Sequence, residues 1–312
     1  MLFNIVAMIT LVVPVFNEEE IIDSLYKRCT ESLMQIKDDF EIICVDDGSK
    51  DNTLNKLIEY HNKDKRFKIL SLSRNFGHQP AVFAGLSYAN GDLIAVIDGD
   101  LQDPPEIIHE FVKKIKEGYD VVYAVRKKRK EGFIKKTAYW FYYRALKKLS
   151  DTEIPLDSGD FCMMRKVVVD NILKMSEQSL FIRGIRAWVG FKQTKIEYVR
   201  DIRQAGVPKY TLKKLFLLAY NGIFSFSRYP VKLFSRLGIT IIIFTIFYII
   251  YILINKFYFG NVPKGFTTLI IFISMFSGIQ LFALGIFGEY ITRIYDETRN
   301  RPLFIVKEKL LD

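Results

Sequence analysis

Two carboxylates follow a short apolar run in the first third of the chain. The run Leu93–Ile97 leads directly into Asp98 and Asp100, with Gly99 between them and Gln102 close behind. Residues i and i+2 of an extended chain point the same way, so the two carboxylates can converge on one ligand. Gln102 adds a neutral oxygen, and Gly99 leaves room for a ligand to approach the backbone. Such oxygen donors suit Mg²⁺ or Mn²⁺, held between carboxylates and substrate phosphates.

A third carboxylate in the same segment has a simpler explanation. Asp103 precedes Pro104 and Pro105. An Asp before a proline at the first helical position is typical of a helix N-cap. We therefore expect Asp103 to cap a helix, whereas Asp98 and Asp100 do not fit that structural role.

Predicted strands and helices alternate from Ile9 to about Val125, and these elements must position the side chains named above. Short runs that are apolar on both faces are separated by amphipathic helices, the first of which is expected to begin at Asn17. This pattern predicts an α/β fold with a mainly parallel sheet covered on both sides. Ligands of such sheets bind at the carboxyl ends of the strands. The residues there are Asn17, Glu18, Asp46, Asp47, Asp98 and Asp100.

The same region lacks two common phosphate-binding motifs. It contains no G-x-x-x-x-G-K-[ST] and no strand-linked G-x-G-x-x-G, which excludes a P-loop and a dinucleotide fingerprint. A nucleotide bound at this edge therefore needs a metal ion to balance its phosphates.

Cysteine content and charge narrow the class of protein further. The three cysteines, Cys29, Cys44 and Cys162, are too few and too scattered for a disulfide framework or a zinc site.

The net charge is +10, and residues 126–148 hold ten Lys or Arg with a single acid, Glu131. Such a basic segment suits nucleic acid, anionic lipid or a phosphorylated substrate.

The C-terminal third favours a membrane. Residues 237–254 and 266–288 carry no charge, and as helices they span roughly 27 and 34 Å, enough for a bilayer core. We expect a transmembrane hairpin with both termini cytoplasmic, because Lys and Arg gather in its flanks. Basic, aromatic segments at 133–149 and 211–232 are typical of helices in the headgroup layer, which argues against nucleic acid.

Taken together, these motifs make the sequence resemble the family-2 glycosyltransferases. Within that family it resembles the bacterial polyprenyl-phosphate glucosyltransferases and the dolichol-phosphate mannose synthases. The resemblance covers nearly the whole chain and rests on VVPVFNEEE, VDDGSKD, SRNFGHQ, DGDLQDPPE, SGDFCMM and YDETRNRPLFIV, in this order. It implies a GT-A fold and inverting transfer of a sugar from a nucleotide donor to a membrane polyprenyl phosphate. The implied organisation is a catalytic domain at 1–210, a juxtamembrane helix at 211–232, two spans within 233–290 and a cytoplasmic tail at 291–312.

The resemblance also implies roles for individual residues. The nucleotide pocket would be lined by Pro14, Phe16, Asn17, Glu18, Asp47 and Asp98. Asp100 and Gln102 would hold Mg²⁺ or Mn²⁺, and Asp160 would sit beside the acceptor as a catalytic residue together with Asp98. Phosphates would be bound by Arg126, Arg183, Arg203 and Lys209. The sequence departs from the family pattern at Cys162, where Arg is common, and at Val207–Pro208, where a small polar pair is usual.

The chemistry of the acceptor limits what Asp160 must do. A phosphate monoester has a second pKa of about 6, so it is mostly deprotonated at pH 7. We therefore expect Asp160 to orient the acceptor and not to act as a strong base. His78, in the SRNFGHQ segment, either supports the donor pocket or is structural.

Several alternatives stay open at this level. UDP-glucose is the favoured donor by resemblance, with UDP-N-acetylglucosamine, UDP-galactose and GDP-mannose as rivals, and undecaprenyl phosphate is the expected acceptor. A processive polysaccharide synthase would need a Q-x-x-R-W-like segment and more spans. A membrane scaffold or flippase component would not need all of the acidic residues. Relatives suggest a homo-oligomer, with a tetramer as one form, and a membrane flippase and glycosyltransferase downstream at the bacterial inner membrane.

Overall fold

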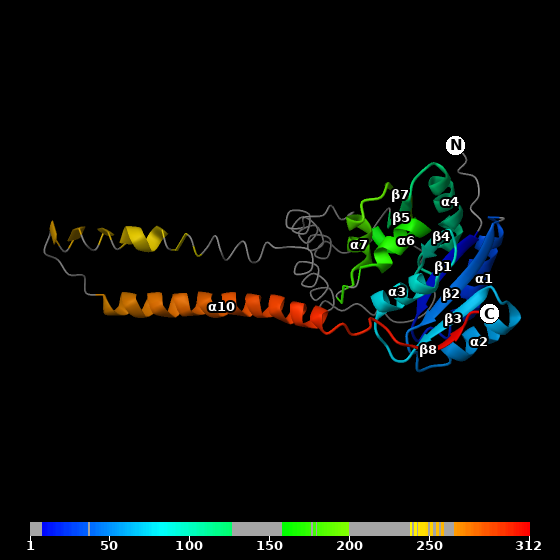
Figure 1. The fold of residues 1–312 in the computed structure, drawn as a ribbon, viewed down its shortest axis with the longest axis horizontal. Coiled ribbons are helices and arrows are strands. Elements are labelled where there is room, and N and C mark those ends of the chain that lie inside the picture. Colours follow the sequence, from blue (N-terminus) through cyan, green and yellow to red (C-terminus); the bar gives the residue numbers. More distant parts are fainter. Residues whose placement is uncertain are drawn as a thin grey trace. The chain divides into compact units, whose positions relative to one another are not determined.

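Figure 1 shows the computed structural model of the chain. The chain forms two compact units. The first holds a mixed sheet and includes the C-terminal residues Arg301–Asp312, and the second includes the described residues between 238 and 300. The structure describes residues 8–36, 38–126, 158–175, 177–178, 180–199, 238, 240–241, 243–248, 250–251, 254–255, 257–258 and 265–312.

The first unit is built on a sheet in the order β7-β5-β6-β4-β1-β2-β3-β8. Neighbours β4, β1, β2 and β3 are parallel, and so are β5 and β7, whereas β6 runs antiparallel to β4 and β5. This is the mainly parallel α/β sheet that the sequence predicts. The strands are β1 (Met8–Val15), β2 (Asp39–Asp46), β3 (Phe67–Leu72), β4 (Leu93–Val96), β5 (Val121–Arg126), β6 (Ser158–Arg165), β7 (Gln193–Tyr198) and β8 (Val306–Leu310).

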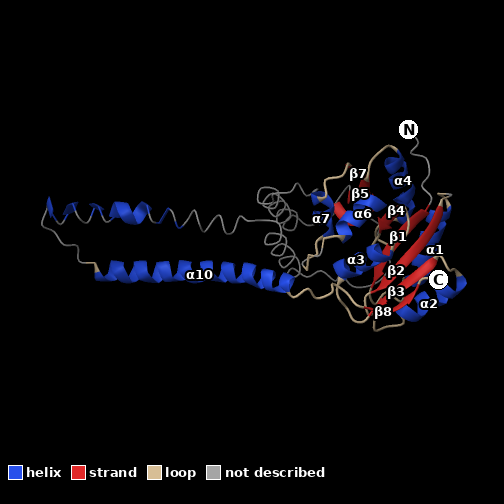
Figure 2. Ribbon diagram, viewed as in Figure 1, coloured by secondary structure: helices blue, strands red, loops and turns tan. Residues whose placement is uncertain are grey.

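Helices cover both faces of the sheet, as Figure 2 shows. Because successive residues of a strand point to opposite faces, the all-apolar strands supply two separate cores. One core packs under α1, α2 and α4, and the other under α3, α6 and α7. The helices are α1 (Ile22–Met34), α2 (Thr53–Lys63), α3 (His78–Tyr88), the 3₁₀ turn η1 (Pro105–Ile107), α4 (Ile108–Lys116), α6 (Lys166–Leu173) and α7 (Ile182–Trp188).

Two expected helix starts are wrong. Helix α1 begins at Ile22 and not at Asn17, whose positive φ of 51° is incompatible with a helix start there. Asp103 is not the N-cap residue: the N-cap of η1 is Pro104, and Asp103 accepts a hydrogen bond from the Tyr198 hydroxyl. In both cases contacts with distant residues decide the local geometry.

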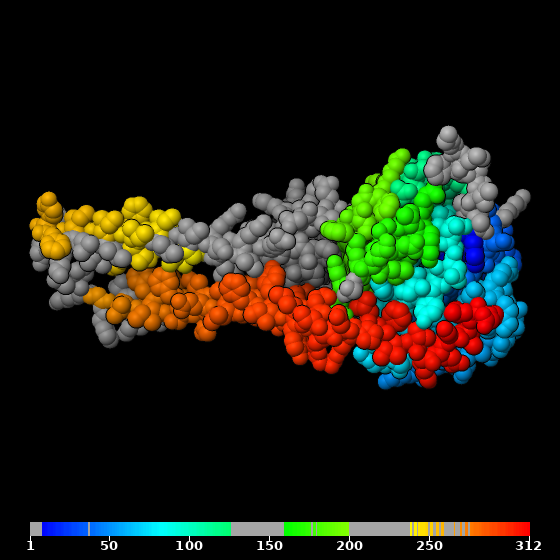
Figure 3. Space-filling view, in the orientation of Figure 1, coloured from blue at the N-terminus to red at the C-terminus, as the bar shows by residue number. Residues whose placement is uncertain are grey.

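The C-terminal end of the chain forms a strand that the sequence did not predict. Strand β8 pairs antiparallel with β3, with Ile69 opposite Leu310 and Leu72 opposite Val306. Just before it, the Ile305 carbonyl accepts a hydrogen bond of 2.9 Å from Ser73 N. Figure 3 shows this segment (red) on the surface of the first unit. The segment expected to be only a tail therefore closes one edge of the sheet.

The second unit contains α10 (Phe266–Thr298), a helix of 33 residues. Within it Met275–Thr298 is long and apolar enough to cross a membrane, with a mean hydropathy of 1.2, and it is the only such helix among the described residues. The expected span 266–288 lies in α10. The described residues of the other expected span, 237–254, are helical, but several of its residues lie outside the described part, as do the expected interfacial helices. The two-span hairpin stays a prediction.

Candidate active site

The strand ends meet at one edge of the sheet, as expected. Val15 of β1 lies beside Asp46 of β2, and Val12 of β1 lies beside Val96 of β4. Because these strands are parallel, the residues that follow them emerge on the same side. Strand β6 brings a further residue to this edge. Val96 pairs with Cys162, so continuing the antiparallel register sets Asp98 opposite Asp160.

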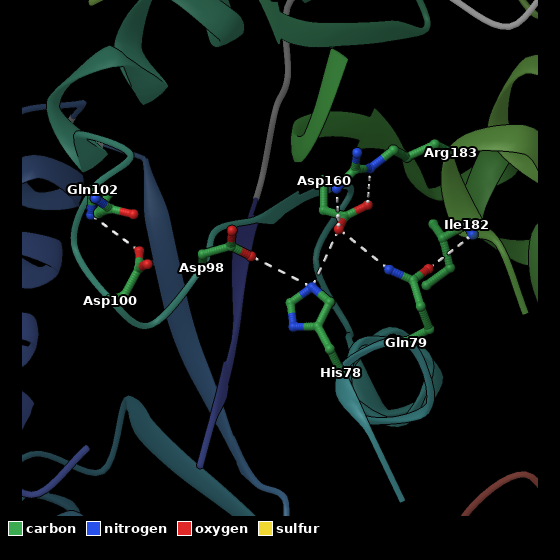
Figure 4. Close-up of polar contacts among 8 residues, drawn as sticks. All are labelled: His78, Gln79, Asp98, Asp100, Gln102, Asp160, Ile182 and Arg183. Atoms are coloured by element: carbon green, nitrogen blue, oxygen red, sulfur yellow. Dashed lines mark hydrogen bonds and ion pairs between the residues drawn. The ribbon is translucent and has the colours of Figure 1, made fainter. Parts of the chain in front are cut away.

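His78 lies between these two carboxylates, as Figure 4 shows. Its Nε2 is 3.4 Å from Asp98 Oδ1 and 3.2 Å from Asp160 Oδ2. His78 opens helix α3, and the preceding Gly77 has a φ of 105°, a conformation open to glycine but rarely to other residues. The turn at Gly77 therefore directs the imidazole into the site.

Asp160 is surrounded by hydrogen-bond donors. Arg183 of α7 reaches its two oxygens with Nε and Nη2 at 2.8 and 2.9 Å, a bidentate geometry. Gln79 Nε2 lies 3.2 Å from Asp160 Oδ2, and Gln79 Oε1 accepts a hydrogen bond of 2.9 Å from Ile182 N. Gln79 therefore ties Asp160 to the start of the helix that carries Arg183.

The charges of this cluster shift each other's proton affinity. Burial alone would lower the pKa of His78, but the hydrogen bond to Asp160 and the negative charges of Asp98 and Asp160 raise it to about 9. Burial would raise the pKa of Asp160, but Arg183 and His78 hold it well below its usual range. At pH 7 the site therefore holds an imidazolium and an ionised Asp160, and a carboxylate with so low a pKa is a poor proton acceptor.

The pKa of Asp98 shifts in the opposite direction to that of Asp160. Burial raises its pKa to about 6, with help from the neighbouring acids Asp103, Asp160 and Asp100, while His78 opposes the shift. Its Oδ1 is buried, lies 3.4 Å from His78 Nε2 and accepts no hydrogen bond from any residue that the structure describes. A buried carboxylate oxygen with spare acceptor capacity, next to a second carboxylate at Asp100, is a donor set that fits a divalent cation.

The structure offers a different set of ligand atoms from the one expected. His78, Asp98 and Asp160 have one potential ligand atom each within 4.8 Å of one another. The Asp100 carboxylate instead accepts a hydrogen bond of 3.2 Å from Gln102 N. His78 ligates a metal ion only in its neutral form, so this trio is one possible donor set and the carboxylates of Asp98 and Asp100 are another. No described contact tests the side chain of Gln102 as a ligand.

Gly99, between the two carboxylates, is required by packing. A Cβ at this position would lie 2.8 Å from the Pro14 carbonyl oxygen and 2.7 Å from Val15 Cγ1. On the side where a Cβ would point, β1 fills the space next to Gly99, and the approach of a ligand to this backbone stays a prediction. Pressed against β1 in this way, the turn holds Asp98 and Asp100 at the sheet edge.

Several residues expected to line a nucleotide pocket make hydrogen bonds between the loops at this edge of the sheet. Asp47 accepts hydrogen bonds from Phe76 N and Gly77 N at 2.7 and 2.9 Å, and burial raises its pKa. Asn17 Oδ1 accepts from Lys50 N at 2.8 Å. Glu18 N donates to Thr53 Oγ1 at 2.9 Å. These bonds shape the loops, and the role of the residues toward a nucleotide stays a prediction.

The other expected site residues are placed only in part. Pro14 lies in β1 opposite Val45, and Phe16 follows that strand. Arg126 is the last residue of β5, level with Tyr198 of β7. Arg203 and Lys209 lie outside the described residues.

The sequence did not single out Gln79, which belongs to the cluster, or Arg186 of α7, which lies over the Tyr123 ring. Gln79 directly follows His78 in a segment that was already singled out, so its position was a usable signal. Arg186 stands one helical turn after Arg183, and nothing in the sequence marks it as more than a surface charge.

Comparison with known proteins identifies the family of the chain. The family model described as glycosyl transferase family 2 matches residues 10–173. The uncharacterized glycosyltransferase YkcC of Bacillus subtilis (strain 168) is 48% identical over 300 residues, covering 96% of this chain and 93% of its own length. The SfII prophage-derived bactoprenol glucosyl transferase of Shigella flexneri is 42% identical over 302 residues, covering 96% and 97%.

One solved structure that the chain matches is glucosyl-3-phosphoglycerate synthase from Mycobacterium tuberculosis, in complex with Mn²⁺, uridine diphosphate and glucosyl-3-phosphoglycerate. It is 19% identical, covers 69% of this chain and 76% of its own, and has a TM-score of 0.45. The family match spans the sheet edge that carries Asp98, Asp100 and Asp160, and the relatives match nearly the full length. The chain therefore belongs to glycosyl transferase family 2.

Proposed function

We propose that the protein transfers a hexose, with inversion at the anomeric carbon, from a nucleotide sugar to undecaprenyl phosphate. The observation that carries this proposal is the cluster of Asp98, His78, Asp160 and Arg183 at the carboxyl edge of a family-2 sheet. Full-length relatives named bactoprenol glucosyl transferase, at about 42% identity, support a polyprenyl phosphate acceptor and favour glucose as the sugar. UDP-glucose is the donor that the sequence resemblance implies.

The donor belongs at the loops that follow β1, β2 and β4. We assign its nucleotide to the pocket of Pro14, Phe16, Asn17, Glu18, Asp47 and Asp98. Asp100, with Asp98 and Gln102 beside it, would hold Mg²⁺ or Mn²⁺. Such a cation, when bound, neutralises the charge that develops on the leaving diphosphate.

The acceptor belongs beside Asp160. This carboxylate is ionised and held by Arg183, Gln79 and His78, so it can orient an incoming group but binds a proton weakly. That suits a phosphate nucleophile, which is already deprotonated at pH 7. The larger barrier is to bring two anionic substrates together, and preorganised cations such as Arg183, together with Arg126, Arg203 and Lys209, would lower it.

The second unit fits an enzyme whose acceptor is a lipid. Helix α10 is long and apolar enough to span a bilayer. We place the catalytic unit and both termini on the cytoplasmic side of the bacterial inner membrane, with two spans and a homo-oligomeric assembly. The lipid-linked sugar would then pass to a flippase and a further membrane glycosyltransferase for modification of a cell-surface glycan.

A donor panel tests the proposal. Detergent-purified protein is incubated with undecaprenyl phosphate and radiolabelled UDP-glucose, UDP-N-acetylglucosamine, UDP-galactose or GDP-mannose, with Mg²⁺ or Mn²⁺ and with or without EDTA. We expect label in the organic phase from UDP-glucose, abolished by EDTA. Label from another donor would reassign the sugar. No label from any donor, with folded protein, would refute the transferase and favour a scaffold.

A further inference from the structure

The turn between β4 and η1 carries the acidic residues of the site in a strained backbone conformation. Leu101, in the middle of this turn, has a φ of 52°, in the left-handed region that a bulky side chain rarely adopts. Such a conformation costs free energy and persists only where the surrounding contacts enforce it. Because strained residues of this kind cluster at active sites, the contacts that enforce the turn are candidates for a functional role.

Packing fixes the first half of the turn. Gly99 lies against β1, where a Cβ would have no room. The side chain of Leu101 is 1% exposed and belongs to the hydrophobic core that packs under α1, α2 and α4. Phe161 and Tyr198 lie in the same core. The strain at Leu101 is therefore held in part by the burial of its own side chain.

A hydrogen bond fixes the last residue of the turn. Asp103 is fully buried, and its carboxylate accepts a bond from the hydroxyl of Tyr198. Tyr198 ends β7, and its ring meets the Phe161 ring edge-on, with the ring centres 5.9 Å apart. Phe161 directly follows Asp160 on β6. The bond therefore ties the acidic turn to β7 and, through the ring contact, to the strand that carries Asp160.

Fold stability alone explains only part of this arrangement. A buried carboxylate carries a desolvation penalty, and a neutral acceptor at Asp103 could take the same hydrogen bond at less cost. The negative charge of Asp103 also helps to raise the pKa of Asp98, so the two carboxylates oppose each other. Like charges this close are favourable only when a cation offsets them.

We propose that Tyr198 is a positioning residue for the cation site, because its hydrogen bond to Asp103 holds the turn that keeps Asp98 at the sheet edge. Asp98 belongs to both of the donor sets that the site offers a cation. Partners outside the ligand shell orient metal ligands in this way. Without the bond, the end of the turn is released and the strain at Leu101 can relax, so Asp98 loses its fixed place. The inference rests on the proposed function, since it takes the cation to be the one that accompanies the diphosphate of the donor.

Mn²⁺ binding to the full chain in detergent tests this role. Tyr198→Phe removes only the hydroxyl, Asp103→Ala removes its acceptor, and the double variant completes a thermodynamic cycle. Tyr60→Phe is the matched control, because the Tyr60 hydroxyl bonds to Asp23 at 2.8 Å outside the site. The Kd of Mn²⁺ alone is measured from the EPR signal of the free ion. In transfer assays, the Mn²⁺ concentration at half-maximal rate is measured together with kcat.

For Tyr198→Phe we expect the Kd of Mn²⁺ and the half-maximal Mn²⁺ concentration to rise roughly 10-fold, the low end of the loss typical of partners outside the ligand shell. At saturating Mn²⁺, kcat should stay within about threefold of the wild type, because excess ion refills the site. A residue that only stabilises the fold would not change these two quantities so unequally. In the Asp103→Ala background, Tyr198→Phe should raise the Kd no further, and Tyr60→Phe should behave as the wild type.

An unchanged Kd of Mn²⁺ in Tyr198→Phe would overturn the inference and leave the bond to Asp103 a support of the fold alone. An equal loss in Tyr60→Phe, or a loss that adds to that of Asp103→Ala, would overturn it as well. If the wild type binds Mn²⁺ but transfers no sugar, the proposed function fails, and the EPR titrations still decide the role of Tyr198. If the wild type binds no Mn²⁺, the inference fails whatever the transfer assay gives.

Discussion

At the scale of single residues, the site is organised around the ionised carboxylate of Asp160. Asp160 accepts from Arg183, Gln79 and His78, and its side chain is 5% exposed. Its low pKa follows from the adjacent guanidinium and imidazolium groups. Its value to the reaction is therefore its position and charge.

Asp160→Asn tests that role. The amide keeps the shape but removes the charge that pairs with the half-buried Arg183, so we expect kcat to fall on the order of 10²- to 10³-fold. Steady-state kinetics with saturating acceptor measure the effect. Asp170→Asn, which disturbs only a surface pair with Lys166, is the control. An Asn variant with wild-type kcat would show that the Asp160 charge is dispensable.

The raised pKa of His78 makes the stability of the fold depend on pH. Its folded pKa of about 9 exceeds the ordinary 6.5, so its stabilising contribution is complete below pH 6.5 and is lost as the pH rises through 9. We expect the free energy of unfolding to decrease across this window in the wild type and less so in His78→Gln. The effect is reduced by solvent, because the side chain is 37% exposed. Denaturant titrations at a series of pH values measure it, and equal slopes in both proteins would contradict it.

At the scale of elements, close packing sets the position of the acidic turn. The Gly99 backbone lies against Pro14 and Val15 of β1, where a Cβ has no room. Gly99→Ala must therefore push the turn that carries Asp98 and Asp100 away from the strand. We expect a loss of about 1–3 kcal/mol in stability, and a rise in the donor KM because the acidic pair moves. Calorimetry and kinetics report the two effects, and an unchanged donor KM would show that the turn tolerates the shift.

Strand β8 is the second element with a role that the sequence hides. It covers the edge of β3, and Ser73 N, at the start of the loop that leads to His78, bonds to Ile305 O. A chain ending at Phe304 loses these contacts and exposes a sheet edge, which favours aggregation.

For this truncated chain we expect a lower Tm and a lower kcat, measured by thermal unfolding and transfer assays. Lys307→Gln changes an exposed residue of the same strand and should leave both unchanged. Full activity after truncation would exclude a link between β8 and the His78 loop.

At the scale of the whole molecule, the sheet restricts the membrane topology. Strand β7 precedes α10 and β8 follows it, yet both belong to one sheet. A sheet lies on one side of a bilayer, so a chain whose α10 spans the membrane must cross it an even number of times between Tyr198 and Val306. The two-span hairpin satisfies this condition, and a single span does not.

Cysteine labelling tests the crossing number. The native Cys29, Cys44 and Cys162 are buried, so added thiols at exposed positions dominate the signal. In intact cells we expect an impermeant maleimide to label Tyr258→Cys, between the two expected spans, but not Lys307→Cys in β8. In inverted vesicles the pattern should reverse. Labelling of both positions from the same side would refute the hairpin.

The sequence by itself determined the fold class, the acidic sheet edge and the family. Apolar runs in alternation with amphipathic helices force a parallel sheet, and parallel strands deliver Asp47, Asp98 and Asp100 to one edge. These are local patterns, and local physics is enough to interpret them.

Only the tertiary structure decided how the residues of the site act on one another. It pairs Arg183 with Asp160 and places His78 between two carboxylates. It also shows that Gln79 bonds to Ile182 and that Arg186 is buried. Each of these facts depends on contacts between segments that are distant in the chain. The start of α1, the partner of Asp103 and the strand at the C-terminus were likewise settled by long-range contacts. A charge in a sequence says nothing of its burial or its partner, and these two factors fix its pKa and its energy.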